Sequence, residues 1–261
     1  MRAPDHAEIR APEFPQGMEW LNAAFLKMDQ QLGRPVLLEF WDFARINSLR
    51  TLPYLQAWHE RYEPLGLRVI GVHSPGYSFG RDSELVAQAA ERLEITWPVV
   101  LDPGFAVWRL YGNRGWPGRY LFDREGQLRV LHYGEGEYLE TEQAVQECLC
   151  EQDTSLELPE PLEPLRPEDA PGAALEPQTA DVALPADRER LELVRDWTDG
   201  EDWIAAADAG AAATMEWSGG EAWAVLSGDE VEPGLHETDG TVVAESPGLR
   251  IHGFQFTPKS P

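Results

Sequence analysis

The sequence has few cysteines and no long apolar run. Its 261 residues include only Cys148 and Cys150, which excludes a framework of disulfides as the source of stability. No window approaches the roughly 18 consecutive apolar residues that a membrane-spanning helix needs. The N-terminal residues are polar and interrupted by proline, without the apolar core of a signal peptide. We therefore expect a cytoplasmic protein without a membrane span.

Positive charge is also scarce, and the negative charge is unevenly distributed. The chain has 21 basic and 46 acidic residues, a net charge of −25. Residues 1–150 carry 15 basic and 21 acidic side chains, whereas residues 151–261 carry 6 and 25. Such a field repels nucleic-acid phosphates and anionic lipids, so neither is expected as a partner. Solubility is a sufficient explanation for the acidity itself.

Short apolar runs alternate with amphipathic stretches from Pro35 onward, which indicates an α/β layer fold. Residues 35–41 and 67–73 are continuous apolar runs typical of strands buried on both faces. Helices are expected at 48–62, with a kink at Pro53, and at 83–93, capped by Asp82 or Ser83. The remaining expected elements are a short strand at 97–102, a short helix at 105–111, a hairpin over 119–133 turning at Gly126, and a helix at 140–150.

The chain divides by composition into three parts. Residues 1–150 form the α/β domain. Residues 151–186 contain seven Pro and nine acidic residues, which predicts an extended and self-repelling linker, although its spaced Leu side chains allow contact with a groove of the first domain. Residues 187–261 contain short alternating runs broken by Gly, Asp and Pro, which predict a small β-sandwich-like domain.

Residues 12–150 resemble the thioredoxin-like domains of the TlpA/ResA/DipZ-type thiol-disulfide oxidoreductases. The phrases that carry the resemblance are PVLLEFWDF, INSLRTLPYLQAWHERY, GLRVIGVHSP, VWRLYGNRGWPGRYLFDREG and HYGEGEY. The C-terminal SPGLRIHGFQFTP is similar to the end of the β-sandwich module that follows in DipZ-type proteins. The resemblance implies a thioredoxin-like fold, with a central mixed sheet between helices, followed by a small β domain.

The family's reactive turn is present without its sulfur atoms. Relatives have W-x-x-x-C-x-x-C followed by a helix-kinking proline, and this chain has Trp41, Arg45, Ser48 and Pro53 at those positions. A cysteine pair at a helix N-terminus works because the helix stabilises a thiolate, which attacks a disulfide. Neither a guanidinium nor an unassisted hydroxyl replaces that nucleophile. We therefore expect no catalytic residue at the usual site.

Other residues take expected roles from the same resemblance. It implies a cis bond at Trp116-Pro117, opposite the turn, and a peptide-binding groove formed by Trp41, Arg45, Ser48, Trp116 and Pro117. Glu39 stands where relatives bury an acid that moves protons for the buried cysteine. Here we expect it to pair with Arg45 or another base, because a buried carboxylate needs a partner.

Arg45 and the two cysteines leave alternatives open. A cation at a helix N-terminus has the unfavourable sign, so Arg45 either points to solvent, pairs with Asp42, or binds an anion with the free amides. Cys148 and Cys150 lie two residues apart on an expected helix and point to nearly opposite sides, so they cannot bind one metal or form an unstrained disulfide. The six His residues show no metal-ligand spacing, and we expect neither metal nor cofactor.

Three functions are compatible with these features. The first is a redox-inactive thioredoxin-fold protein that binds a peptide, a protein or an anion. The second is a thiol-disulfide oxidoreductase that uses Cys150 or a partner's thiols. The third is a carbohydrate-binding adaptor that uses Trp197, Trp203, Trp217 and Trp223 of the β domain. The oligomeric state is left open.

Overall fold

The computed structural model describes residues 9–151 and 154–261, so expectations for residues 1–8 and 152–153 lie outside the described residues. The chain forms two compact units. Unit 1 consists of the residues up to Asp42, Asn47–Pro75 and Gly80–Pro171. Unit 2 consists of Phe43–Ile46, Gly76–Phe79 and Gly172–Pro261.

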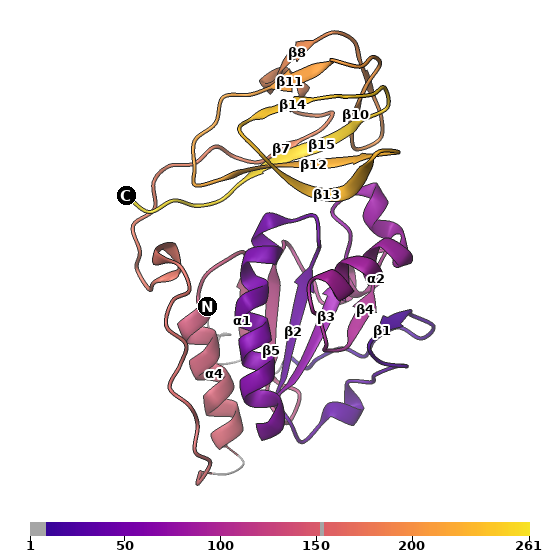
Figure 1. Cartoon of the computed structure of the whole chain (residues 1–261). Coiled ribbons are helices and arrows are strands. Elements are labelled where there is room, and N and C mark those ends of the chain that lie inside the picture. The colour runs from indigo at the N-terminus through magenta and orange to yellow at the C-terminus, as the bar shows by residue number, and fades with distance from the viewer. Residues whose placement is uncertain (1–8, 152–153) are drawn as a thin grey trace. The chain divides into compact units, whose positions relative to one another are not determined.

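Unit 1 contains one mixed sheet with the strand order β1-β4-β3-β2-β5-β6 (Figure 1). Strands β2, β3 and β4 are parallel, whereas β5 and β6 form an antiparallel hairpin beside β2. The strands are β1 (Trp20–Leu21), β2 (Val36–Trp41), β3 (Arg68–His73), β4 (Val99–Leu101), β5 (Gly118–Phe122) and β6 (Leu128–Tyr133). The α-helices are α1 (Ile46–Tyr62), α2 (Ser83–Arg92), α3 (Ala106–Leu110) and α4 (Tyr138–Cys150). This is the expected thioredoxin-like fold.

Local sequence signals explain these elements. All six residues of β2 are buried, as a parallel strand covered on both faces requires. The Asp82 side chain accepts a hydrogen bond from the Glu84 amide and thereby caps α2. Gly126 turns the β5–β6 hairpin with a φ of 76°, which a side chain would disfavour. Pro53 lies inside α1, as expected.

The sheet buries apolar side chains on both faces. On one face, Val36, Leu38 and Phe40 of β2 join a core that also contains Val107 of α3. Because side chains alternate along a strand, Glu39 points to the opposite face. Helices α1 and α4 cover that face and are joined there by Glu142, which accepts hydrogen bonds from Arg61 and Tyr62 at 2.6 Å each (Figure 1).

The segment 151–186 differs from the extended linker that we expected. Residues 159–169, which we call the strap, lie along α1 and α4 within unit 1, and unit 1 ends only at Pro171. Four hydrogen bonds hold the strap's backbone: Gln146 to Pro159 O (2.8 Å), Leu162 N to Glu142 (2.8 Å), Leu165 N to Tyr54 (2.8 Å), and Arg61 to Glu160 O. The spaced Leu side chains allowed such contact, but composition does not show which helix side chains complement the backbone and acids of this segment.

Unit 2 contains two antiparallel sheets around a shared core and is sandwich-like, as expected. The larger sheet has the order β13-β12-β15-β10-β9, with β7 also paired to β15, and the smaller sheet has the order β14-β11-β8. The larger sheet comprises β7 (Val182–Ala183), β9 (Trp197–Asp199), β10 (Ile204–Ala206), β12 (Ala222–Gly228), β13 (Val231–Thr238) and β15 (Arg250–Phe256). The smaller sheet comprises β8 (Glu192–Val194), β11 (Ala212–Thr214) and β14 (Thr241–Val243).

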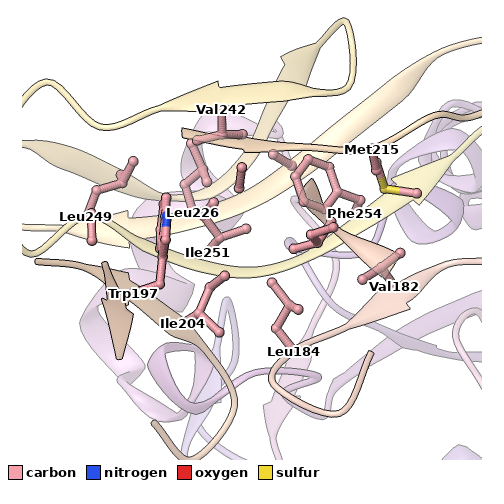
Figure 2. Packing of buried hydrophobic residues seen from close by; sticks show 14 of the residues in the cluster. Val182, Leu184, Trp197, Ile204, Met215, Leu226, Val242, Leu249, Ile251 and Phe254 are labelled. Carbon is pink, nitrogen blue, oxygen red and sulfur yellow. The ribbon is translucent and has the colours of Figure 1, made fainter. Parts of the chain in front are cut away.

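Both sheets of unit 2 contribute side chains to its core. Figure 2 shows Ile204, Ile251 and Phe254 from the larger sheet and Val242 from the smaller one. Strand β7 supplies Val182 to the same cluster. Unit 2 therefore begins before residue 187, the boundary that composition predicted.

Candidate functional site

The first turn of α1 contains Ser48, one of the two residues at the expected cysteine positions. Ser48 is the third residue of the helix and is 1% exposed. Its Oγ accepts a hydrogen bond from the backbone amide of Asp42 at 3.3 Å. Ser48 therefore bonds the start of the loop between β2 and α1, a structural role expected of a serine in the first turn of a helix.

Arg45 belongs to unit 2, and its described contact is aromatic. Its guanidinium lies 4.6 Å from the centre of the Tyr77 ring, a cation–π arrangement. It also acts on Asp181: burial raises the pKa of that carboxyl group, and the positive charge of Arg45 lowers it in part. The described partners of Arg45 are therefore an aromatic ring and Asp181, whereas its pairing with Asp42 or with a bound anion stays a prediction.

The backbone of the same turn is bound by a buried glutamine of unit 2. The Gln255 Oε1 accepts a hydrogen bond from the Ile46 amide at 2.8 Å, and its Nε2 donates to the Ala44 carbonyl at 2.8 Å. Gln255 is 1% exposed. A side-chain amide therefore takes the helix-terminal N–H that an anion would need, which weighs against the anion-binding alternative.

Glu39 forms an ion pair with Arg119. The two residues lie directly opposite each other on β2 and β5, with Arg119 Nε 3.2 Å from Glu39 Oε2. Both side chains are 1% exposed. Burial raises the pKa of Glu39, and the charge and hydrogen bond of Arg119 offset that effect in part. We expected Glu39 to pair with Arg45 or another base, and its described partner is another base, Arg119.

Arg119 is fixed on its other sides as well. Its guanidinium donates to the Thr141 hydroxyl at 3.1 Å and to the Gly136 carbonyl at 3.2 Å. The same group lies 5.2 Å from the Trp58 ring and 5.3 Å from the Tyr138 ring. Glu39 is thus held by a cation that contacts residues of α1 and α4.

The Trp116-Pro117 bond is cis, which confirms the expectation. Pro117 is buried and immediately precedes β5, whereas Trp116 is half-buried. The Trp116 Nε1 donates a hydrogen bond to the Ser74 carbonyl at 2.8 Å, which fixes the indole at the end of β3.

Trp41, one of the expected groove residues, lies in the interior of unit 1. It is 2% exposed, and its ring packs on Gly71 of β3, where a Cβ would stand 3.0 Å from the Trp41 Nε1. Of the five expected groove residues, Trp41, Ser48, Trp116 and Pro117 belong to unit 1 and Arg45 to unit 2. The groove remains an expectation, and only Trp116 among the unit 1 members is not fully buried.

The two cysteines are free thiols at the end of α4. Cys148 is 1% exposed, and burial raises its pKa to about 12, although Arg129 opposes the shift. Cys150 is half-buried. No group of three or more His, Cys, Asp or Glu side chains that could hold a metal occurs within residues 9–151 and 154–261. Within the same residues, no helix is long and apolar enough to cross a membrane.

The four tryptophans proposed for carbohydrate binding are largely occupied by packing. Trp197 belongs to the core of unit 2, and Trp217 packs against that core. Trp203 lies 4.8 Å under the Arg250 guanidinium, and the Trp223 Nε1 donates to Glu221 at 3.3 Å. Trp197 is buried and the other three are partly buried, so carbohydrate binding through these rings stays a prediction.

Sequence reasoning missed Arg119 as the partner of Glu39. The two residues are far apart in sequence, and only the β2–β5 register places them opposite each other. A usable signal existed, because a lone Arg inside an apolar strand needs a buried acid. Gln255 carried no comparable signal, since its role depends on the tertiary position of β15.

Comparison with known proteins agrees with this architecture. Residues 10–131 match the AhpC/TSA family. Protein DipZ of Mycobacterium bovis is 38% identical over 172 residues, which are 65% of this chain and 25% of that protein. The thiol-disulfide oxidoreductase YkuV of Bacillus subtilis is 28% identical over 124 residues, 47% of this chain and 82% of that protein. This chain thus spans about a quarter of the length of DipZ.

Solved structures are similar over the same part of the chain. A thiol-disulfide isomerase from Corynebacterium glutamicum is 22% identical with a TM-score of 0.48, covering 53% of this chain and 96% of that one. The structure itself contains the mixed sheet, the cis Trp116-Pro117 bond and the helix that follows β2. Residues 10–131, a little under half of the chain, are thus similar to the AhpC/TSA family.

Proposed function

We propose that this protein is a redox-inactive member of its family that binds a peptide or protein partner. The observation that carries the proposal is the pair of residues at the reactive positions: Arg45 precedes α1 and Ser48 lies in its first turn. A dithiol site needs one sulfur to attack and a second to resolve the mixed disulfide. Neither residue provides a sulfur, and the Ser48 hydroxyl is engaged with the Asp42 amide.

Two further observations support loss of the chemistry. Glu39, which would serve a buried cysteine, is held by Arg119. Of the two thiols in the chain, Cys148 is buried with a pKa raised to about 12, so its thiolate is scarce near neutral pH. The cis Trp116-Pro117 bond and the surrounding fold remain, and these are the parts with which relatives hold peptides.

A disulfide-reduction assay tests the redox half of the proposal. Insulin reduction by dithiothreitol is followed with the full chain, with the Cys150→Ser variant, and with YkuV as a positive control. We expect the full chain and the variant to match the rate without protein, whereas YkuV accelerates the reaction. Acceleration by the full chain that disappears in Cys150→Ser would establish the alternative function, an oxidoreductase that uses Cys150.

A further inference from the structure

Three aromatic rings form a continuous cluster beside the cis bond, all within unit 1. We call Phe105, Trp108 and Trp116 the aromatic patch. The Trp108 and Trp116 ring centres are 4.5 Å apart, and Phe105 lies 5.7 Å from Trp108 and 6.5 Å from Trp116. All three side chains are half-buried, so each ring also presents part of its area to solvent. The patch extends the region around Trp116 onto α3.

The patch is rigidly positioned. Phe105 has a φ of 58° and a ψ of 28°, a left-handed conformation that is rare for a bulky residue. Its amide bonds the Asp102 carbonyl at 3.0 Å, and the buried Asp102 carboxylate accepts from the amides of Val107 and Trp108 at 3.0 and 2.9 Å. Strained residues of this kind persist where the surroundings fix them, and they cluster at binding sites.

The chain segment that carries the patch is rich in arginine and poor in acid. Residues 103–122 contain no Asp or Glu and three Arg, in a protein of net charge −25, although the buried Asp102 immediately precedes them. Arg119 is buried with Glu39, so the two exposed cations of this segment are Arg114 and Arg109, which also donates to the Gly104 carbonyl at 2.9 Å. Two exposed guanidinium groups on the same segment as partly accessible aromatic rings favour a ligand that brings both a carboxylate and an apolar group.

We propose that the aromatic patch, with Arg109 and Arg114, binds an extended segment of a partner protein in which an acidic residue adjoins an aromatic, aliphatic or proline side chain. This proposal rests on the proposed binding function and specifies its partner. Tryptophan and arginine are the residues that most often dominate binding energy at protein interfaces, and preformed rings lower the entropy cost of binding. The apolar side chain packs on the rings, and the carboxylate pairs with a guanidinium group.

The chain itself provides a precedent for this chemistry. The strap is an acidic, proline-containing segment held by arginine and tyrosine side chains: Arg50 binds Glu168 at 3.0 Å, and Tyr54 donates to Asp169 at 2.8 Å. Nucleic acid is the other class that Arg and aromatic side chains bind together, but the overall charge opposes it.

A randomised dodecapeptide phage library panned on the full chain tests the proposal. We expect enriched peptides in which Asp or Glu adjoins Trp, Phe, Leu or Pro. Synthetic copies should lose affinity by about ten-fold or more in Trp108→Ala and in Arg109→Glu/Arg114→Glu. The matched control Arg34→Glu/Arg124→Glu, with the same charge change at other solvent-accessible sites of unit 1, should bind as the unaltered chain does.

The outcomes separate this inference from the proposed function. Enriched peptides that bind the patch variants with unchanged affinity overturn the patch as the site but leave a binding function elsewhere. Enrichment of basic peptides or of none overturns the partner chemistry. Because Trp108 also packs against the core, circular dichroism must show that the Trp108→Ala variant keeps the unaltered fold. The surface Arg variants test the proposal independently of that packing. Insulin reduction by the full chain would overturn the redox half without deciding the peptide result.

Discussion

The N-terminus of α1 and the C-terminus of α4 differ both in sulfur content and in electrostatic environment. At the start of α1, the helix dipole and the first-turn amides would stabilise a thiolate, but Arg45 and Ser48 provide no sulfur. At the end of α4, two sulfurs are present, but the helix C-terminus carries the negative end of the dipole and Cys148 is buried. The environment that would activate a thiol therefore occurs at a helix N-terminus, whereas the two sulfur atoms occur at a helix C-terminus.

The largest expected effect concerns Cys148. At pH 8, a thiol with a pKa of about 12 has roughly a thousand-fold less thiolate than an ordinary cysteine, and the side chain is also inaccessible. In native Cys150→Ser, alkylation of Cys148 by iodoacetamide should therefore be slower by about that factor or more than in urea, as followed by mass spectrometry. Equal rates with and without urea would contradict the assigned burial.

The second prediction concerns the contribution of the buried Glu39–Arg119 pair to the free energy of unfolding. Arg119→Met leaves the Glu39 carboxylate buried without its cation, and we expect the free energy of unfolding to fall by about 3–5 kcal/mol at pH 7. Urea unfolding measures the change. The double variant Glu39→Gln/Arg119→Met removes the unpaired charge and should recover much of the loss. A single variant as stable as the unaltered chain would show that the pair contributes nothing.

The third prediction restores sulfur where the environment favours it. In Arg45→Cys/Ser48→Cys, the thiol introduced at position 45 stands before the first turn of α1, so its pKa should fall from about 8.5 toward ~7. At pH 7 this raises the thiolate fraction by about ten-fold over an ordinary thiol. The pH dependence of alkylation measures the pKa, and insulin reduction measures the gained activity. A fully folded variant with an ordinary thiol pKa and no activity would mean that the site has diverged beyond its two sulfurs.

The smallest expected effect is a pH dependence at Glu39. Burial raises its folded-state pKa above the ordinary value of 4.5, with Arg119 opposing the shift. The contribution of this group to stability is therefore complete below pH 4.5 and is lost as pH rises through the folded-state pKa. Relative to Glu39→Gln, the unaltered chain should lose stability as pH increases from about 4 to 8, by at most about 1.4 kcal/mol per pH unit. A constant difference across this range would exclude the raised pKa.

Local signals predicted most of unit 1. The apolar run of β2, the Asp82 cap and Gly126 each act within a few residues, so the sequence determines them directly. The cis bond at Trp116-Pro117 was predicted from the family resemblance, which no local propensity supplies.

Features that depend on tertiary register were not predictable in the same way. The Glu39–Arg119 pair needs the β2–β5 register, and the role of Gln255 needs the position of β15. In unit 2, short strands were expected without individual bounds. Strands β9 and β10 span three residues each, and β13 contains Pro233 and Gly234, so these strands carry no clear alternating pattern.

The strap determines where a recombinant fragment of the thioredoxin-like part should stop. Truncation at Cys150 would remove Leu162 and Leu165, whose amides bond Glu142 and Tyr54, and it would uncover the stacked rings of Tyr54 and Tyr138, 3.7 Å apart. A fragment that ends at Pro171 retains these contacts. The shorter fragment should be the more prone to aggregate, since it exposes aromatic surface that the full chain covers.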